Sequence, residues 1–130
     1  MMALDTNLLA RLLLQDEPAQ HAKVVALLSS DAVFTAPTTV FLELVWVLEA
    51  HDCTPQEIKA GLERLLGLQN FKPANGQVLR TALAAYGKGM DFADALHLGL
   101  SAAEKEFRTF DKRLARKATA LGLSPTVRMV

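Results

Sequence analysis

The chain has 130 residues, of which 51% are hydrophobic and 22% charged, and its 14 basic and 14 acidic residues cancel to zero net charge. This composition is typical of a soluble globular protein, and the length predicts a single domain, residues 1–130, with a real core. Zero net charge argues against a protein that coats nucleic acid by bulk electrostatics, but it allows a nuclease with a local cationic rim. No apolar run reaches the ~18 residues of a membrane span, no signal segment precedes the first motif, and the single cysteine, Cys53, is expected to be an inert thiol. We therefore expect a cytoplasmic protein.

Helical and strand patterns alternate along the whole chain. Leucines at helical spacing begin after Asp5, Thr38 and Thr39 are placed to cap a helix, and Thr54-Pro55-Gln56-Glu57 has the form of a capping box. The expected helices are 5–15, 18–30, 38–49, 55–66, 74–88, 91–105 and 112–121, and the expected short strands are 2–4, 32–35, 69–71, 107–110 and 125–127. Such alternation favours a parallel sheet with helices on both faces.

Two of the acidic residues directly follow predicted strands. Asp5 comes after the short apolar start of the chain, and Asp111 comes after Phe107-Arg108-Thr109-Phe110. Ligand sites of open α/β sheets lie at the carboxyl ends of strands. Both acids also stand where a helix N-cap is expected, and the two interpretations are compatible because a helix N-terminus favours negative charge beside it.

Two further acids lie within predicted helices. Glu43 interrupts a segment that is apolar almost all round, which predicts a buried carboxylate that needs either a salt bridge or a metal ion. Asp91 and Asp94 are three residues apart, so they would share a helix face and repel each other, and something positive should offset them. Asp91 could also simply be the N-cap. His97 lies on the same side, and we expect it to be a hydrogen-bonded neighbour rather than a ligand.

Together the acids predict a site for a divalent metal ion. Carboxylate oxygens without soft partners select Mg²⁺ or Mn²⁺ over zinc, and a pair of such ions would lie roughly 3.5–4 Å apart. The predicted ligands are Asp5, Glu43, Asp94 and Asp111. Cations near these acids would bind phosphates of a substrate, and the candidates are Arg11, Lys112, Arg113 and Arg116. For the basic residues near the C-terminus, a plain solvated helix face is the alternative.

The order of these motifs resembles that of the PIN-domain ribonucleases, and specifically the VapC-type toxins of toxin–antitoxin pairs. The matching segments are Asp5-Thr6-Asn7, Glu43 to Leu48, Asp94 to His97 and Thr109-Phe110-Asp111. The resemblance implies a three-layer α/β/α fold, metal-dependent endoribonuclease activity, a homodimer, and an antitoxin partner that sends a basic side chain toward the acids. It also implies that Asp5, Glu43, Asp94 and Asp111 are the catalytic acids, that Asp91 is an accessory acid, and that Thr6 and Thr109 help to hold the acids or water.

Other classes of protein fit less well. A haloacid-dehalogenase-type phosphatase needs a second aspartate two positions after the first, and this chain has Asn7 there. Two alternatives stay open: a catalytically silent PIN scaffold that binds RNA or protein, and a stand-alone PIN nuclease outside a toxin operon.

Overall fold

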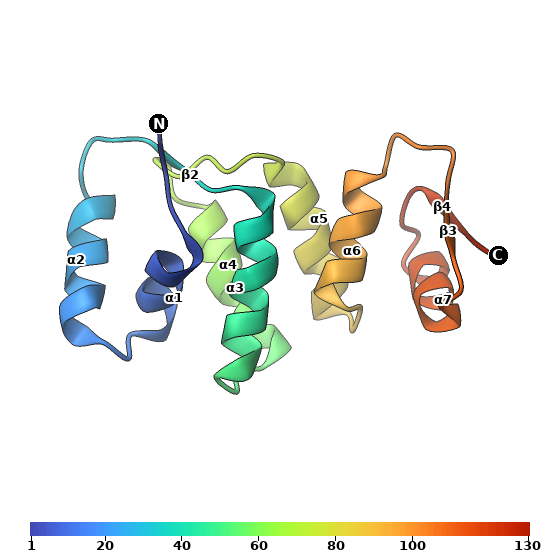
Figure 1. Ribbon diagram of the computed structural model, residues 1–130, viewed down its shortest axis with the longest axis horizontal. Helices are drawn as coiled ribbons and strands as arrows, with labels where there is room; N and C mark the ends of the chain where they lie inside the picture. Colours follow the sequence, from blue (N-terminus) through green and yellow to red (C-terminus); the bar gives the residue numbers. More distant parts are fainter. The chain divides into compact units, whose positions relative to one another are not determined.

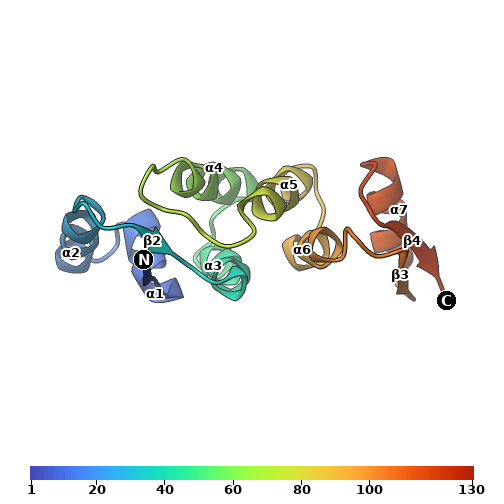
Figure 2. The same cartoon turned by 90° about the horizontal axis from the view of Figure 1, so that it is seen from above.

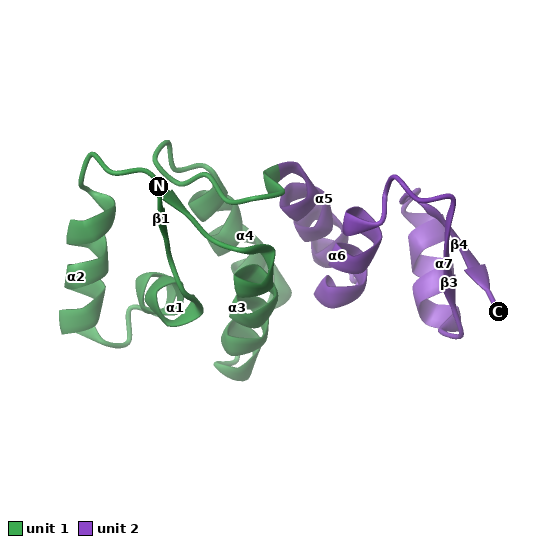
Figure 3. Ribbon diagram, turned by 45° about the horizontal axis from the view of Figure 1, so that its top comes forward, with its two compact units in different colours: residues 1–76 green, residues 77–130 purple.

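Short parallel strands and helices alternate along the chain in the computed structural model, which describes all residues from Met1 to Val130. In chain order the elements are β1 (Met2–Ala3), α1 (Thr6–Leu14), α2 (Pro18–Leu28), β2 (Phe34–Thr35), α3 (Thr38–Ala50), α4 (Pro55–Leu66), α5 (Gly76–Gly87), α6 (Phe92–Leu100), β3 (Glu106–Thr109), α7 (Lys112–Ala120) and β4 (Thr126–Met129), as labelled in Figure 1. All strand pairs are parallel, so the predicted α/β class is confirmed. None of the helices has the length and apolar character of a membrane-spanning segment. The elements divide between two units, Met1–Gly76 and Gln77–Val130 (Figure 3).

In the first unit, α1 lies between α2 and α3 and packs against both, as Figures 1 and 2 show, and α3 also packs against α4. Strand β1 pairs in parallel with β2, and Phe34 of β2 forms a further parallel bridge to Phe71. The core forms where these helices meet the strands: Leu9, Phe34 and Phe41 are fully buried, and the rings of Phe41 and Phe71 stack with centroids 6.0 Å apart. This packing fixes α1 against α3, the two elements that carry the acids of this unit.

The second unit contains a parallel strand–helix–strand arrangement. Strands β3 and β4 pair in register from Glu106 opposite Thr126 to Thr109 opposite Met129, and α7, which connects them, packs against β4. Glu106 holds this end of the sheet together by accepting from Arg108 at 2.8 Å and from Arg128 at 2.9 Å. As a result, the carboxyl end of β3 leads directly into the N-terminus of α7.

Helices α5 and α6 approach each other closely in the same unit. A Cβ atom placed on Gly99 would lie 2.7 Å from Cγ1 of Val78, so only glycine allows this spacing. The rings of Tyr86 and Phe92 pack edge to face, with centroids 5.9 Å apart, and bury the start of α6. This packing anchors the helix turn that carries Asp94.

The predicted elements are mostly confirmed, including the capping box, in which Thr54 Oγ1 accepts from the Glu57 N–H and Glu57 Oε1 accepts from the Thr54 N–H. The main differences from the prediction are a strand, a cap and two helix ends. Residues 69–71 contribute one bridge rather than a strand. Helix α3 begins after Pro37 without a side-chain cap, so Thr38 and Thr39 lie inside it. Helix α5 begins at Gly76 because Asn75 has φ +58°, which no right-handed helix accepts. Helix α6 ends at Leu100, not 105, because the N–H of Ser101 closes the last turn on the carbonyls of His97 and Leu98.

Candidate functional site

Asp5 stands at the junction between β1 and α1, where the sequence predicts it. The preceding residue completes the strand pairing, because the Leu4 N–H donates to the Thr35 carbonyl at 2.8 Å. Asp5 is then the N-cap of α1, and its Oδ1 accepts from the Leu8 N–H at 3.0 Å. A carboxylate has two oxygens, so capping leaves Oδ2 of this exposed side chain able to bind a cation.

Thr6 connects this junction to Glu43. Thr6 is only 7% exposed, and it is the only polar residue of the chain that is buried. Its Oγ1 donates a hydrogen bond to Oε1 of Glu43, 37 positions later on α3. A buried hydroxyl without a partner would be costly, so this bond satisfies Thr6 and orients Glu43 at the same time. In the first unit, Thr6 therefore follows Asp5 in the chain and binds Glu43 through its side chain.

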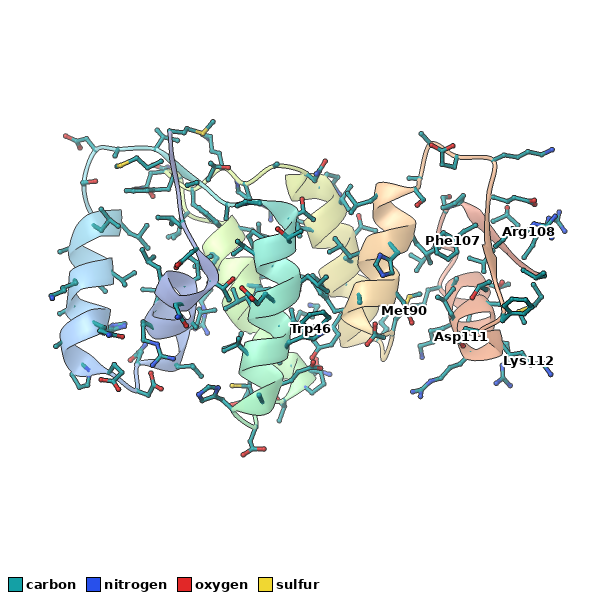
Figure 4. The ribbon with its side chains drawn as sticks, in the orientation of Figure 1. Trp46, Met90, Phe107, Arg108, Asp111 and Lys112 are labelled. Carbon is teal, nitrogen blue, oxygen red and sulfur yellow. The ribbon has the colours of Figure 1, made fainter.

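The prediction that Glu43 is buried was wrong. Helix α3 buries Phe41, Leu44 and Val45, but Glu43 lies on its exposed side and makes no ion pair. Trp46, three residues farther on, is 56% exposed, and Figure 4 shows it on α3. Residues three and four apart share a helix face, so an apolar helix still has one solvent-facing stripe, and the acid lies in that stripe.

If the chain cleaves RNA, as its resemblance to the PIN-domain ribonucleases implies, the substitution Thr6→Val should lower the rate about tenfold to a hundredfold, because it removes the hydrogen bond that orients Glu43. Thr6→Ser keeps the hydroxyl and should restore most of the rate. Initial cleavage rates of the two variants and the wild type, measured at saturating Mn²⁺, check this. Equal rates for Thr6→Val and wild type would show that the hydrogen bond has only a structural role.

The second unit gathers three further acids near the starts of α6 and α7. Asp91 is the N-cap of α6 and accepts from the Asp94 N–H at 3.0 Å, and Asp111 is the N-cap of α7 and accepts from the Leu114 N–H at 3.0 Å. The capping interpretation is thus confirmed for both. Asp94 is half-buried in the first turn of α6 and caps nothing. Of these three acids, Asp94 is the one whose carboxylate does not cap a helix.

The electrostatics of Asp94 differ from those of the other acids. Burial raises the pKa of the Asp94 carboxyl above its ordinary value, the negative charges of Asp91 and Asp111 raise that pKa further, and the nearby His97 opposes the shift. The charged form of Asp94 is therefore less favourable than that of a free aspartate in water, and a cation near it would offset this electrostatic cost. Thr109 supports the same region, because its Oγ1 accepts from the Asp111 N–H at 3.0 Å.

The predicted phosphate-binding cations have different surroundings. Arg11 pairs with Asp16 at 3.0 Å and lines a hollow between α1 and α2. Lys112, Arg113 and Arg116 are exposed along α7 and form no ion pair, so they are available to an anionic ligand. Lys23 of α2 lines the same hollow as Arg11.

The donor set fits a hard divalent cation, since the acids offer carboxylate oxygens and no thiolate. The structure brings no three His, Cys, Asp or Glu side chains together as a metal site. Asp5 and Glu43 belong to residues 1–76, and Asp94 and Asp111 belong to residues 77–130. Carboxylates of this kind can bind a metal ion and thereby act on a phosphodiester.

Comparison with known proteins agrees with this chemistry. No curated protein matches the chain. The PIN domain family model matches residues 2–120, a segment that contains all four acids and extends over both units. PIN domains are in general nucleases that bind nucleic acid and use divalent metal ions, so a nuclease-type function follows for this chain. With its alternating helices and short parallel strands, the chain belongs to the PIN domain family.

Proposed function

We propose that this protein is a metal-dependent endoribonuclease in which Asp5, Glu43, Asp94 and Asp111 together hold one or two Mg²⁺ or Mn²⁺ ions. The observation that carries the proposal is the family match over residues 2–120, a segment that contains the four acids. Because the match extends over both units, we also propose that residues 1–130 act as a single PIN domain.

Each side chain has a distinct part in the proposed reaction. A divalent ion, when bound, supplies activation of water at neutral pH and neutralisation of charge on the phosphate. The four acids hold the ion, Thr6 orients Glu43 through its hydroxyl, and Thr109 holds the bend that presents Asp111. Asp91 fixes the start of α6 and adds negative charge next to Asp94. Lys112, Arg113 and Arg116 bind backbone phosphates and set affinity rather than sequence preference.

The alternative of a catalytically silent scaffold has less support. All four acids are present, and those that cap helices use one carboxylate oxygen for the cap. A scaffold that only bound RNA would have no need of acids, because they repel phosphates. We therefore prefer the nuclease.

We further propose that the protein is the toxin of a toxin–antitoxin pair and that it forms a homodimer. A partner arginine suits the acids, because a guanidinium offers two parallel hydrogen bonds to a carboxylate. The first unit also has a hollow of about 300 Å³ between the end of α1, α3 and α4, lined by Leu13, Leu14, Leu48 and Ile58 among others. Its lining combines these apolar side chains with Glu57 and Arg64, and it would accept a side chain from an antitoxin helix. This subtype rests on the sequence resemblance and on this hollow.

The binding of Mn²⁺ tests the proposed site without depending on activity. Trp46 is the single tryptophan of the chain and lies one helical turn from Glu43 on the exposed side of α3. We expect paramagnetic Mn²⁺ to quench its fluorescence and Mg²⁺ to compete. The melting temperature should also rise, since a ligand at a hundred times its Kd adds about 2.7 kcal/mol to the free energy of unfolding.

Two variants make this measurement specific. Asp94→Asn should abolish both the quenching and the rise in melting temperature, although Asp94 lies in the other unit from Trp46. Asp31→Asn removes an exposed acid outside the proposed site and should change neither. Unchanged fluorescence and melting temperature of the wild type at millimolar Mn²⁺ would contradict the proposed metal site.

A further inference from the structure

Phe110 is the only phenylalanine of the chain whose side chain is mostly exposed to solvent. Of the six phenylalanines, Phe34, Phe41, Phe71 and Phe92 are buried and Phe107 is half-buried. Phe110 is 80% exposed. Leaving an aromatic ring in water forgoes the free energy of burying it, so this ring stays available for contact with a ligand.

The backbone around Phe110 is held on both sides. Before it, the Thr109 carbonyl accepts from the Val130 N–H at 3.0 Å. After it, the Asp111 N–H donates to Thr109 Oγ1 at 3.0 Å, and Asp111 caps α7. Turning Phe110 into the core would break the cap that places Asp111. The structure thus presents the ring at a fixed position next to one of the proposed metal ligands.

The polar surroundings of Phe110 are mostly cationic. Arg108 precedes it on β3, and Lys112 and Arg113 follow it on α7; all three are exposed. Figure 4 shows Arg108, Asp111 and Lys112 around the end of β3 and the start of α7. Lys112 and Arg113 have no acidic partner in the chain. Arg108 pairs with Glu106, so Lys112 and Arg113 are the cations near Phe110 in the chain that have no ion pair. An exposed flat ring next to exposed cations is complementary to a ligand that combines flat bases with phosphates.

We propose that Phe110 stacks against an RNA base beside the phosphate that is cut and so positions the RNA strand at the acids. The faces of bases in a duplex are already covered by their neighbours, whereas unpaired bases can stack on an aromatic side chain. This inference rests on the proposed function, because it names a further side chain that binds RNA at the same site. It assigns Phe110 a role in positioning the substrate.

Substitutions of Phe110 test the stacking directly. With single-stranded RNA, Phe110→Ala should lower kcat/KM by about 10- to 100-fold, the range for loss of one base–aromatic stack. Phe110→Trp should keep the rate, and Phe110→Leu should not rescue it, because leucine is apolar but has no ring. A hairpin that pairs the same sequence in its stem should be cut slowly by every variant. Binding of Mn²⁺, measured through Trp46, should be the same in all of them.

Val130 provides the matched control. It is 71% exposed and bonded through its N–H to Thr109, so it shares the neighbourhood of Phe110 without having a ring. Val130→Ala should leave cleavage unchanged if the ligand is a base. If Phe110→Ala and Val130→Ala both leave cleavage unchanged but both disrupt association with another protein or a second copy of the chain, the apolar pair is a protein interface and the inference is overturned.

Oligonucleotides that each lack one base locate the contact. Removing the base that stacks on Phe110 should slow the wild type by the same factor as Phe110→Ala, and it should cost the variant nothing further. If no position shows this behaviour while the wild type still cuts RNA, the inference fails and the proposed function stands. If the wild type cuts no RNA at any Mn²⁺ concentration, it is the proposed function that fails.

Discussion

Asp94→Asn should abolish metal-dependent cleavage of RNA while leaving the fold intact. Asparagine has the shape of aspartate but no charge, and the loss of one anionic ligand removes much of the several kcal/mol that a bound ion contributes to the transition state. At about 1.4 kcal/mol per factor of ten, the rate should fall at least about 1000-fold. Cleavage of a labelled single-stranded RNA, followed at saturating Mn²⁺, measures the loss.

The same substitution should not destabilise the metal-free protein. The Asp94 carboxylate caps nothing, and its raised pKa means that its charge is unfavourable beside Asp91 and Asp111. Removing that charge should leave the melting temperature without metal equal to that of the wild type or slightly higher. A loss of activity together with a lower melting temperature would indicate damage to the fold rather than loss of a ligand.

Asp5→Asn offers an independent test in the other unit. Asparagine is as good an N-cap as aspartate, so α1 should keep its cap while the charge is lost. Cleavage should again fall to background. Full activity in either Asp5→Asn or Asp94→Asn would show that the proposed site is wrong, whereas Asp31→Asn should cleave RNA at the wild-type rate.

The positions of Asp5, Asp91 and Asp111 were predictable because they depend on local sequence. An acid that follows an apolar run and precedes a helical pattern is placed by the three or four residues on either side of it. The structure confirms the N-cap of each of the three helices. It also shows why capping and metal binding were not real alternatives, since a cap uses one oxygen of a carboxylate that has two.

The surroundings of Glu43 were not predictable from its neighbours in sequence. Its segment is apolar on almost every side, and only the packing of α3 against α1 and α4 decides which stripe faces solvent. The hydrogen bond from Thr6 joins residues 37 positions apart, which no local pattern indicates. For the same reason, the exposure of Phe110 could not be predicted: as the last residue of Phe107 to Phe110 it reads as part of a strand, but β3 ends at Thr109.

The proposed toxin role makes a prediction about cells. Burial and the charges of Asp91 and Asp111 make the charged form of Asp94 less favourable than that of a free aspartate. The α7 cations Lys112, Arg113 and Arg116 form no ion pair within the chain. The proposed toxin role requires that another molecule restrain the enzyme. A partner with an arginine for the acids and apolar side chains for the hollow beside Leu13 and Leu48 would supply it.

Expression of the chain alone should therefore arrest growth, and co-expression of the gene immediately upstream should restore it. The Asp94→Asn variant is the control: it should be equally soluble and harmless, because its fold is retained and its cleavage lost. The upstream product should also lower the cleavage rate of the purified enzyme and compete with Mn²⁺ quenching of Trp46, since its basic side chain would take the place of the metal. Normal growth with an active and soluble wild-type product would exclude the toxin role, and the ribonuclease would then act without a dedicated inhibitor.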